Sequence, residues 1–145
     1  MLAAMSAGSH VFFDHTGDFA VDLRAPTREA LYEEVARAWI ELLTDAPGSV
    51  AERETRALEV SGVDESDLLV ALGNELLFAF ETEAWLAARI TIDELDESSL
   101  RATAHGEAYD PERHSIARPV KAVTHHGAEV REQDGAWIGR LIFDL

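Results

Sequence analysis

The sequence predicts an α+β protein in which two amphipathic helices pack on one face of a mainly antiparallel sheet. Two segments carry apolar residues at helical spacing, and six shorter segments are continuously apolar or alternate between apolar and polar residues. The last four of these strands follow one another without a helix, which is typical of an antiparallel meander. The expected order of elements is therefore β-α-β-α-β-β-β-β.

Both predicted helices have a clear start and one apolar face. Thr27 follows a proline and is a good N-cap, and the second helix begins near Asp64. The first helix ends at the turn residues 44–48. The apolar faces consist of Leu31, Val35, Trp39, Leu42 and Leu43 in the first helix, and of Leu69, Leu72, Leu76 and Phe80 in the second.

The predicted strands cover six segments that are separated by the helices or by turn residues. They are residues 19–23, 58–60, 90–92, 100–104, 120–130 and 137–145. Short polar turns at 96–99 and 133–135 join neighbouring strands as hairpins. We expect a single domain over residues 12–145, preceded by a flexible leader at residues 1–11.

The charge of the chain limits the classes of partner. It contains 28 acidic and 12 basic residues, which give a formal net charge of −16. Such a surface repels phosphate backbones and anionic membranes, so we expect neither direct nucleic-acid binding nor a membrane partner. It favours either a basic protein partner or simply solubility. The absence of cysteine excludes disulfides and thiolate zinc sites, and is compatible with a cytoplasmic protein.

Two segments are candidates for a cation site. Residues 14–18 include Asp14, His15 and Asp18, and form either a strand-entry turn or a loop that aims carboxylates and an imidazole at a cation. At the other end, the Asp144 side chain and the main-chain carboxylate of Leu145 lie one residue apart. Taken alone, this pair is either half of a site for a hard cation or an accident of where the chain stops.

The segment 119–126 places a lysine in an apolar strand. Strand alternation puts Lys121 and His125 on one face and His126 on the other, so the adjacent histidines cannot bind one metal without a bulge. Lys121 either holds a phosphate or carboxylate, or protects an edge strand from aggregation. His114 lies in the polar turn 110–114 and is expected to be exposed to solvent.

Several motifs, in order, resemble the archease family. His-Thr-Gly-Asp at 15–18 resembles the His-Thr-Ala-Asp box of that family, and residues 67–77 resemble its second helix. Residues 106–114, followed by 120–126, are similar to its most distinctive stretch. The family also ends on a strand that closes with Asp and one apolar residue. The resemblance extends from about residue 12 to residue 145.

The resemblance implies an accessory protein and not an enzyme. Archeases assist RtcB-type RNA ligases in tRNA splicing and RNA repair, where they promote guanylylation of the ligase by GTP and its repeated turnover. Carried over by position, the metal-binding acids of the family fall on Asp18 and Asp144, joined by the Leu145 carboxylate. The functional lysine falls on Lys121, and His15 is next to the site in sequence. Such oxygen ligands suit calcium, magnesium or manganese.

Two other classes of function remain open from the residues alone. One is a free-standing metal-dependent phosphoester hydrolase that uses Asp18, His15 and Asp144, although the sequence has no Gly-rich phosphate loop and no Gly-x-Ser-x-Gly elbow. The other is a purely structural interaction module. Hydrolysis by the isolated protein would identify the first, and unchanged partner function after substitution of the aspartates would identify the second.

Overall fold

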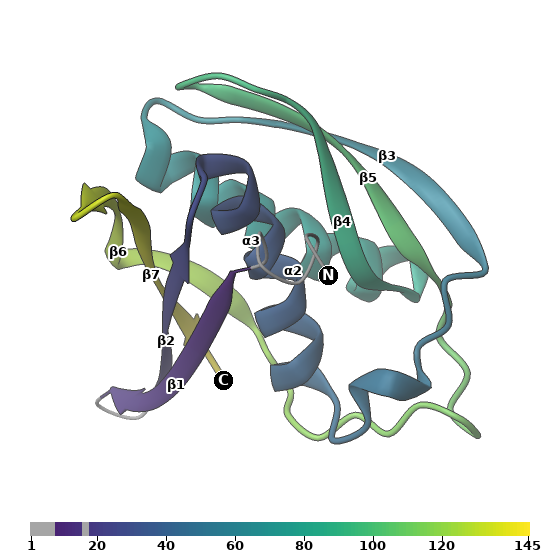
Figure 1. Cartoon of the computed structure of the whole chain (residues 1–145). Coiled ribbons are helices and arrows are strands. Elements are labelled where there is room, and N and C mark those ends of the chain that lie inside the picture. The colour runs from purple at the N-terminus through teal and green to yellow at the C-terminus, as the bar shows by residue number, and fades with distance from the viewer. Residues whose placement is uncertain (1–7, 16–17) are drawn as a thin grey trace.

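The computed structural model describes residues 8–15 and 18–145, and shows the α+β fold that the sequence predicts (Figure 1). In this part of the chain neither helix is long and apolar enough to cross a membrane. The elements are, in order, β1 (Ser9–His15), β2 (Asp18–Ala25), α2 (Arg28–Leu43), the 3₁₀ turn η1 (Pro47–Ser49), β3 (Glu54–Ser61), α3 (Glu65–Glu83), β4 (Trp85–Leu95), β5 (Ser99–Ala108), β6 (Ala122–Gln133) and β7 (Ala136–Asp144).

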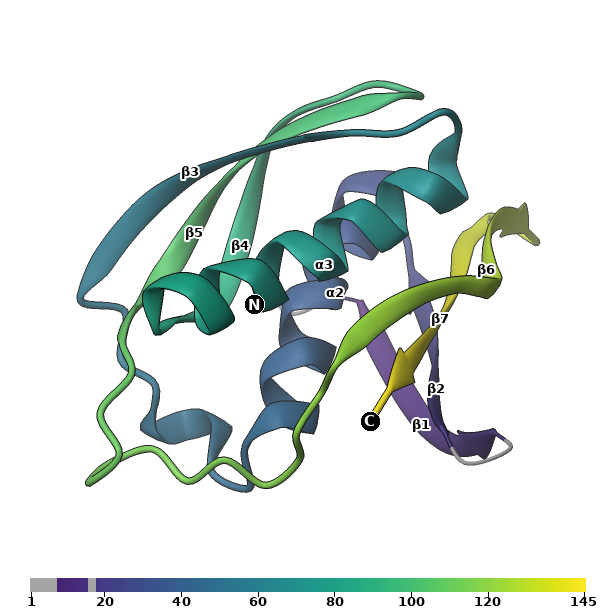
Figure 2. The ribbon, with the colours of Figure 1, turned by 180° about the vertical axis from the view of Figure 1, so that it is seen from behind.

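The strands form two antiparallel sheets and not the single sheet expected from the sequence. One sheet has the strand order β1-β2-β7-β6 and the other has the order β3-β5-β4. Helices α2 and α3 lie between them, as two views of the ribbon show (Figure 1 and Figure 2). Eleven of the sixteen residues of α2 are buried, which is more than one helix face provides. The predicted apolar stripe is therefore only part of the surface that α2 buries.

Strand β1 was not predicted, and it precedes the strand that the sequence places first. It pairs with β2 along its whole length and begins at Ser9, inside the segment expected to be a flexible leader. Residues 1–7 of that segment lie outside the described residues. The ring nitrogens of His10 contact Glu34 of α2 at 2.5 Å and Glu41 at 3.0 Å. These contacts with a distant helix fix β1 in place.

The predicted helix starts are confirmed, and the turns set the ends of the strands. Thr27 and Asp64 cap α2 and α3, because each side chain accepts a first-turn backbone N–H, at 3.1 and 2.9 Å. Asp134 and Gly135 have φ values of 52° and 79°, the conformation that Asp-Gly favours in a tight hairpin. This turn between β6 and β7 lies at the opposite end of β7 from Asp144.

Helix α3 holds the start of β6, and thereby the residue that precedes it, Lys121. The Asn74 side chain donates to the carbonyl of Val123 and accepts its N–H, each at 2.9 Å. A Cβ at Gly73 would lie only 3.0 Å from the Val123 side chain, so the glycine permits the close approach. Leu69, Leu72 and Leu76 of the predicted stripe are buried. Polar and apolar contacts together therefore fix β6 on α3.

Candidate functional site

Three of the predicted site residues meet at one end of the four-stranded sheet. The register of β2 on β7, continued by one residue, places Asp18 beside Asp144. On the other side of β7, Ala122 of β6 is opposite Asp144, and the Lys121 N–H donates to the Asp144 carbonyl at 2.8 Å. Figure 1 shows the end of β7 near the end at which β1 and β2 meet. Strand pairing thus brings together residues from three distant parts of the sequence.

Both aspartates belong to the outer face of this sheet, away from the helices. Their neighbours Phe19 and Phe143 pack against the core, and successive side chains of a strand point to opposite faces. The two carboxylates are partly exposed, and neither has a hydrogen-bond or ion-pair partner among the residues that the structure describes. Adjacent like charges on paired strands are unfavourable, so a cation bound between them would relieve the repulsion.

The described side chains alone do not complete a metal site. No group of three or more His, Cys, Asp or Glu side chains able to hold a metal ion occurs within residues 8–15 and 18–145. Asp18 and Asp144 nevertheless supply the hard oxygen donors that calcium, magnesium or manganese prefer. The His15 backbone pairs with Asp18, whereas its side chain and residues 16–17 lie outside the described residues. Asp14 and His15 thus belong to the end of β1, and Asp18 begins β2.

A buried carboxylate, which the sequence reasoning missed, fixes the segment that leads to Lys121. Glu107 is 3% exposed and accepts hydrogen bonds from Ala51 N at 2.8 Å, His114 Nε2 at 2.8 Å and Arg113 Nη2 at 2.6 Å. The prediction that His114 is exposed is wrong, since it is 2% exposed. Its Nδ1 accepts the N–H of Asp110 at 2.8 Å, so the polar turn folds back onto β5.

The charge states of this cluster follow from its hydrogen bonds. Burial raises the pKa of Glu107, but the bonds from Arg113, Ala51 and His114 outweigh it and lower the pKa to about 2. Because Nδ1 of His114 accepts a backbone N–H, its Nε2 carries the proton donated to Glu107. These bonds hold the turn 110–114 against β5. Its signal in the sequence was the distinctive stretch 106–114.

Strand β6 leaves the predicted alternation after Thr124. Its register on β7 shifts between Thr124 and Glu129, and Gly127 within this bulge has a φ of 78°. His125, also in the bulge, contacts Asp67 of α3 at 2.7 Å. His125 thus faces helix α3, as Val123 does, and not the acidic end of the sheet.

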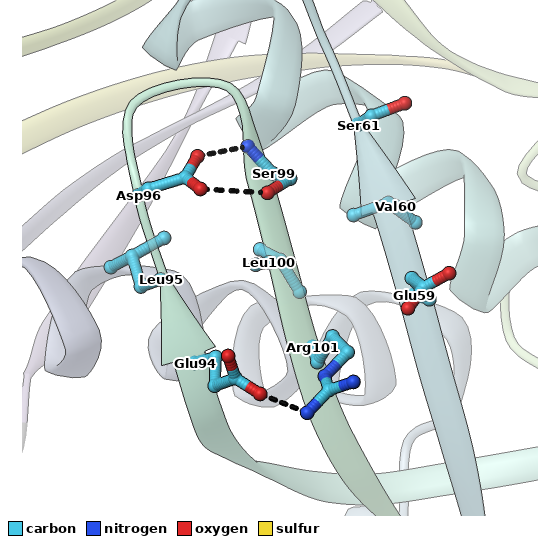
Figure 3. Close-up of a pocket in the computed structure, with 9 residues that line it drawn as sticks. All are labelled: Glu59, Val60, Ser61, Glu94, Leu95, Asp96, Ser99, Leu100 and Arg101. Carbon is cyan, nitrogen blue, oxygen red and sulfur yellow. Dashed lines mark hydrogen bonds and ion pairs between the residues drawn. The ribbon is translucent and has the colours of Figure 1, made fainter.

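A cavity of about 420 Å³ lies on the three-stranded sheet and contains none of the predicted site residues (Figure 3). Among its charged side chains, Glu94 pairs with Arg101. Asp96 accepts the N–H and hydroxyl of Ser99 at 2.8 and 3.0 Å, and bonds from Ser98 and Ser99 lower the pKa of Asp96. Glu94, Arg101 and Asp96 therefore already have partners within the β4–β5 hairpin. The acidic end of the four-stranded sheet is the better candidate site.

Comparison with known proteins decides the family. The model of the archease protein family matches residues 10–145. The chain belongs to the archease family. Protein archease of Methanopyrus kandleri is 36% identical over 135 residues, which cover 91% of this chain and 96% of the relative. Protein archease of Sulfolobus acidocaldarius is 30% identical over 135 residues, which cover 92% of this chain and 96% of the relative.

Solved structures have the same fold as this archease. The solution structure of Methanobacterium thermoautotrophicum protein 1598 has a TM-score of 0.77 at 34% identity, and the match covers 94% of this chain and 98% of that protein. The crystal structure of an archease from Thermotoga maritima, described as a possible chaperone, has a TM-score of 0.65 at 17% identity and covers 92% and 94%. At that identity the second structure supports the fold alone.

Proposed function

We propose that this archease is an accessory protein that activates an RtcB-type RNA ligase in tRNA splicing and RNA repair. It promotes guanylylation of the ligase by GTP and repeated turnover, and it performs no catalysis itself. The observation that carries this proposal is the strand register, which brings Asp18, Asp144 and Lys121 to one end of one sheet. These are three of the positions at which the resemblance to archeases implies function.

The charge of the chain supports a protein partner and argues against direct contact with RNA or a membrane. With a net charge of −16, this archease would be repelled by free RNA and by anionic lipid. An enzyme that binds RNA presents a basic cleft, into which an acidic protein is drawn. Cytoplasmic location belongs to the same proposal, because the ligase acts on tRNA and other RNA ends.

The acidic end of the sheet would hold a divalent cation, namely calcium, magnesium or manganese. The ligands are Asp18, Asp144 and the main-chain carboxylate of Leu145, with His15 as a neighbouring group. The bound cation would neutralise phosphate charge at the nucleotide site of the ligase. Calorimetric titration with calcium tests this site without any ligase. We expect Asp18→Asn and Asp144→Asn to weaken binding, whereas Asp134→Asn, the same change at the opposite end of β7, should not.

The ligase assay tests the function directly. The cognate ligase is incubated with GTP, with and without this archease, and both its guanylylation and its number of turnovers are measured. We expect stimulation by the wild type and by Asp134→Asn, but not by Asp18→Asn or Asp144→Asn, with circular dichroism confirming that all variants are folded. If the wild type changes neither quantity, the proposal is wrong.

Two further arms separate the alternatives. Phosphoester hydrolysis by the archease alone with manganese would show a free-standing hydrolase instead of an accessory protein. Extension of the chain beyond Leu145 should abolish stimulation, because it converts the main-chain carboxylate into a peptide carbonyl. Full stimulation by the extended protein would remove Leu145 from the site, and leave the two aspartates to bind the cation.

A further inference from the structure

Arg118 and Lys121 differ from most basic residues of this acidic chain, because neither forms an ion pair with a carboxylate of the residues that the structure describes. The chain has 12 basic residues, all of which the structure describes, and nine of them form ion pairs with Asp or Glu. Within the described residues, the three basic side chains without such a pair are Arg24, Arg118 and Lys121. With 28 acidic residues available, this lack of pairing needs an explanation.

Two of these three cations border the same cavity. Arg118 and Lys121 line a cavity of about 320 Å³, whose walls are otherwise mainly apolar and include Phe80 and Val120. Apolar walls exclude water and thereby strengthen the interaction of a cation with an anion. The third unpaired cation, Arg24, lies on the outer face of β2. It lines a different cavity, to which Asp22 and Arg140 also contribute. Arg24 therefore offers a matched control.

The guanidinium of Arg118 is held in place and still has free donors. Its Nη1 donates to the carbonyl of Leu42 at 3.0 Å, and its Cζ lies 5.2 Å from the centroid of the Phe19 ring. The first contact satisfies a carbonyl at the C-terminal end of α2, which is a structural role. That role uses one of the five N–H donors of arginine. The other donors and the full positive charge remain available to an anion.

The cavity lies at the same end of the four-stranded sheet as the two aspartates, but toward the helices. Phe19, whose ring contacts the Arg118 guanidinium, directly follows Asp18 in β2. The Lys121 N–H donates to the Asp144 carbonyl. One end of the sheet therefore presents carboxylates on its outer face and two unpaired cations on its inner side. This arrangement separates a cation-binding surface from an anion-binding surface by the thickness of one sheet.

We propose that Arg118 and Lys121 bind a phosphate group in this cavity. Phosphate is favoured because it carries up to two negative charges, which match two cations, and because it accepts several hydrogen bonds. The inference rests on the proposed function, in which the ligase uses GTP and RNA ends that carry phosphate, and it adds Arg118 and the class of ligand. A nucleotide and an RNA end present the same phosphate chemistry to this site.

Glu81 of α3 also lines the cavity and sharpens the test. Its carboxylate has no hydrogen-bond or ion-pair partner in the described part of the chain, and it opposes an anion in the cavity. Neutralising Glu81 should therefore strengthen phosphate binding, while neutralising Arg118 or Lys121 should weaken it. Changes in opposite directions are difficult to produce by partial unfolding.

The experiment titrates the whole protein with inorganic pyrophosphate, followed by nuclear magnetic resonance of the backbone amides and of the arginine Nε–H groups. At about 0.1 M ionic strength the Debye length is about 10 Å, so distant acidic residues are screened. We expect saturable shifts at residues 116–121. Arg118→Gln and Lys121→Gln should each weaken binding about tenfold, as loss of a charge-assisted hydrogen bond does. Glu81→Gln should tighten binding, and Arg24→Gln should leave it unchanged.

Three results would overturn the inference. They are the absence of saturable shifts, shifts that map away from residues 116–121, and an equal loss of binding in Arg24→Gln, which would show a general effect of charge. Because the Lys121 side chain has no hydrogen bond or ion pair within residues 8–15 and 18–145, Lys121→Gln remains informative even if Arg118→Gln does not fold. GTP and an RNA with a 3′-phosphate, each titrated next, distinguish the sources of the phosphate.

The outcome is separable from that of the proposed function. An archease that stimulates the ligase but does not bind pyrophosphate refutes the phosphate site and leaves the accessory role intact. An archease that binds pyrophosphate through Arg118 and Lys121 but does not stimulate the ligase supports the site and refutes the accessory role.

Discussion

Replacement of Glu107 by Gln should destabilise this archease strongly, because both oxygens of the carboxylate are fully used. Oε1 accepts a hydrogen bond from Arg113 and forms an ion pair with Arg53, and Oε2 accepts hydrogen bonds from Ala51 and His114. A glutamine side chain has one oxygen and one NH₂ group. In either orientation its NH₂ group faces two donors, so it loses hydrogen bonds and adds repulsion.

The magnitude follows from the pKa of this carboxyl. The pKa of Glu107 is about 2, compared with the ordinary value of 4.5. Since one pKa unit corresponds to about 1.36 kcal/mol, the ionised group contributes about 3 kcal/mol to the free energy of unfolding at neutral pH. A lowered pKa in the folded state means that this stability is present above pH 4.5 and is lost as the pH falls toward 2. In a domain of this size, 3 kcal/mol corresponds to a decrease in Tm of about 6–12 °C.

Urea denaturation of the wild type and of Glu107→Gln, at pH 7 and at several values down to pH 2.5, measures this effect. We expect a difference of about 3 kcal/mol at pH 7 that shrinks as the pH falls. Glu112→Gln is the control, because it makes the same change on an exposed side chain of the adjacent segment, and it should alter stability by less than about 0.5 kcal/mol. A difference below that size for Glu107→Gln, or one independent of pH, would refute the reasoning.

Three further substitutions test contacts that hold individual strands in place. The pKa of His10 is raised, chiefly by its hydrogen bond to Glu34. The contribution of His10 to stability is therefore complete below pH 6.5 and is lost as the pH rises through the folded-state pKa. His10→Gln should remove this pH dependence in denaturation curves measured between pH 5 and 9. Asn74→Ala loses both bonds to Val123 and should cost about 2 kcal/mol by the same assay. Gly106→Ala would make the new Cβ clash with the Leu86 carbonyl oxygen and should prevent correct pairing of β4 and β5. Gly48 has open space around it, so Gly48→Ala should fold normally. Circular dichroism of both variants measures this difference.

Local patterns predicted much of the fold, and long-range contacts account for what was missed. Helical spacing and caps located both helices, because those signals lie within a few residues of one another. Strand β1 was missed because its position depends on the bonds of His10 to Glu34 and Glu41 of α2. His114 seemed exposed because its polar neighbours suggest a surface turn. The carboxylate of Glu107, from strand β5, and the N–H of Asp110 satisfy both ring nitrogens, which makes burial of that imidazole favourable.

The predicted site residues were indicated by resemblance to archeases, and strand pairing places three of them at one end of a sheet. Nothing in the spacing of Asp18, Lys121 and Asp144 along the chain shows that they are neighbours, because the β2–β7 and β6–β7 registers bring them together. Arg118 gave no signal at all. Its importance appears only when the ion pairs of the folded chain show which cations remain without a carboxylate.

The effect of the two aspartates on the free energy of unfolding distinguishes a role in binding from a role in stabilising the fold. Other carboxylates of this sheet are used by the fold, as Asp22 is by Arg140 at 2.7 and 3.0 Å. Asp18 and Asp144 instead lie side by side without a partner in the described residues, so their mutual repulsion opposes folding. Their replacement by Asn should therefore leave the free energy of unfolding unchanged or slightly higher in metal-free solution, while calcium binding is lost. Side chains that stabilised the fold would give the opposite result, a lower free energy of unfolding with or without calcium.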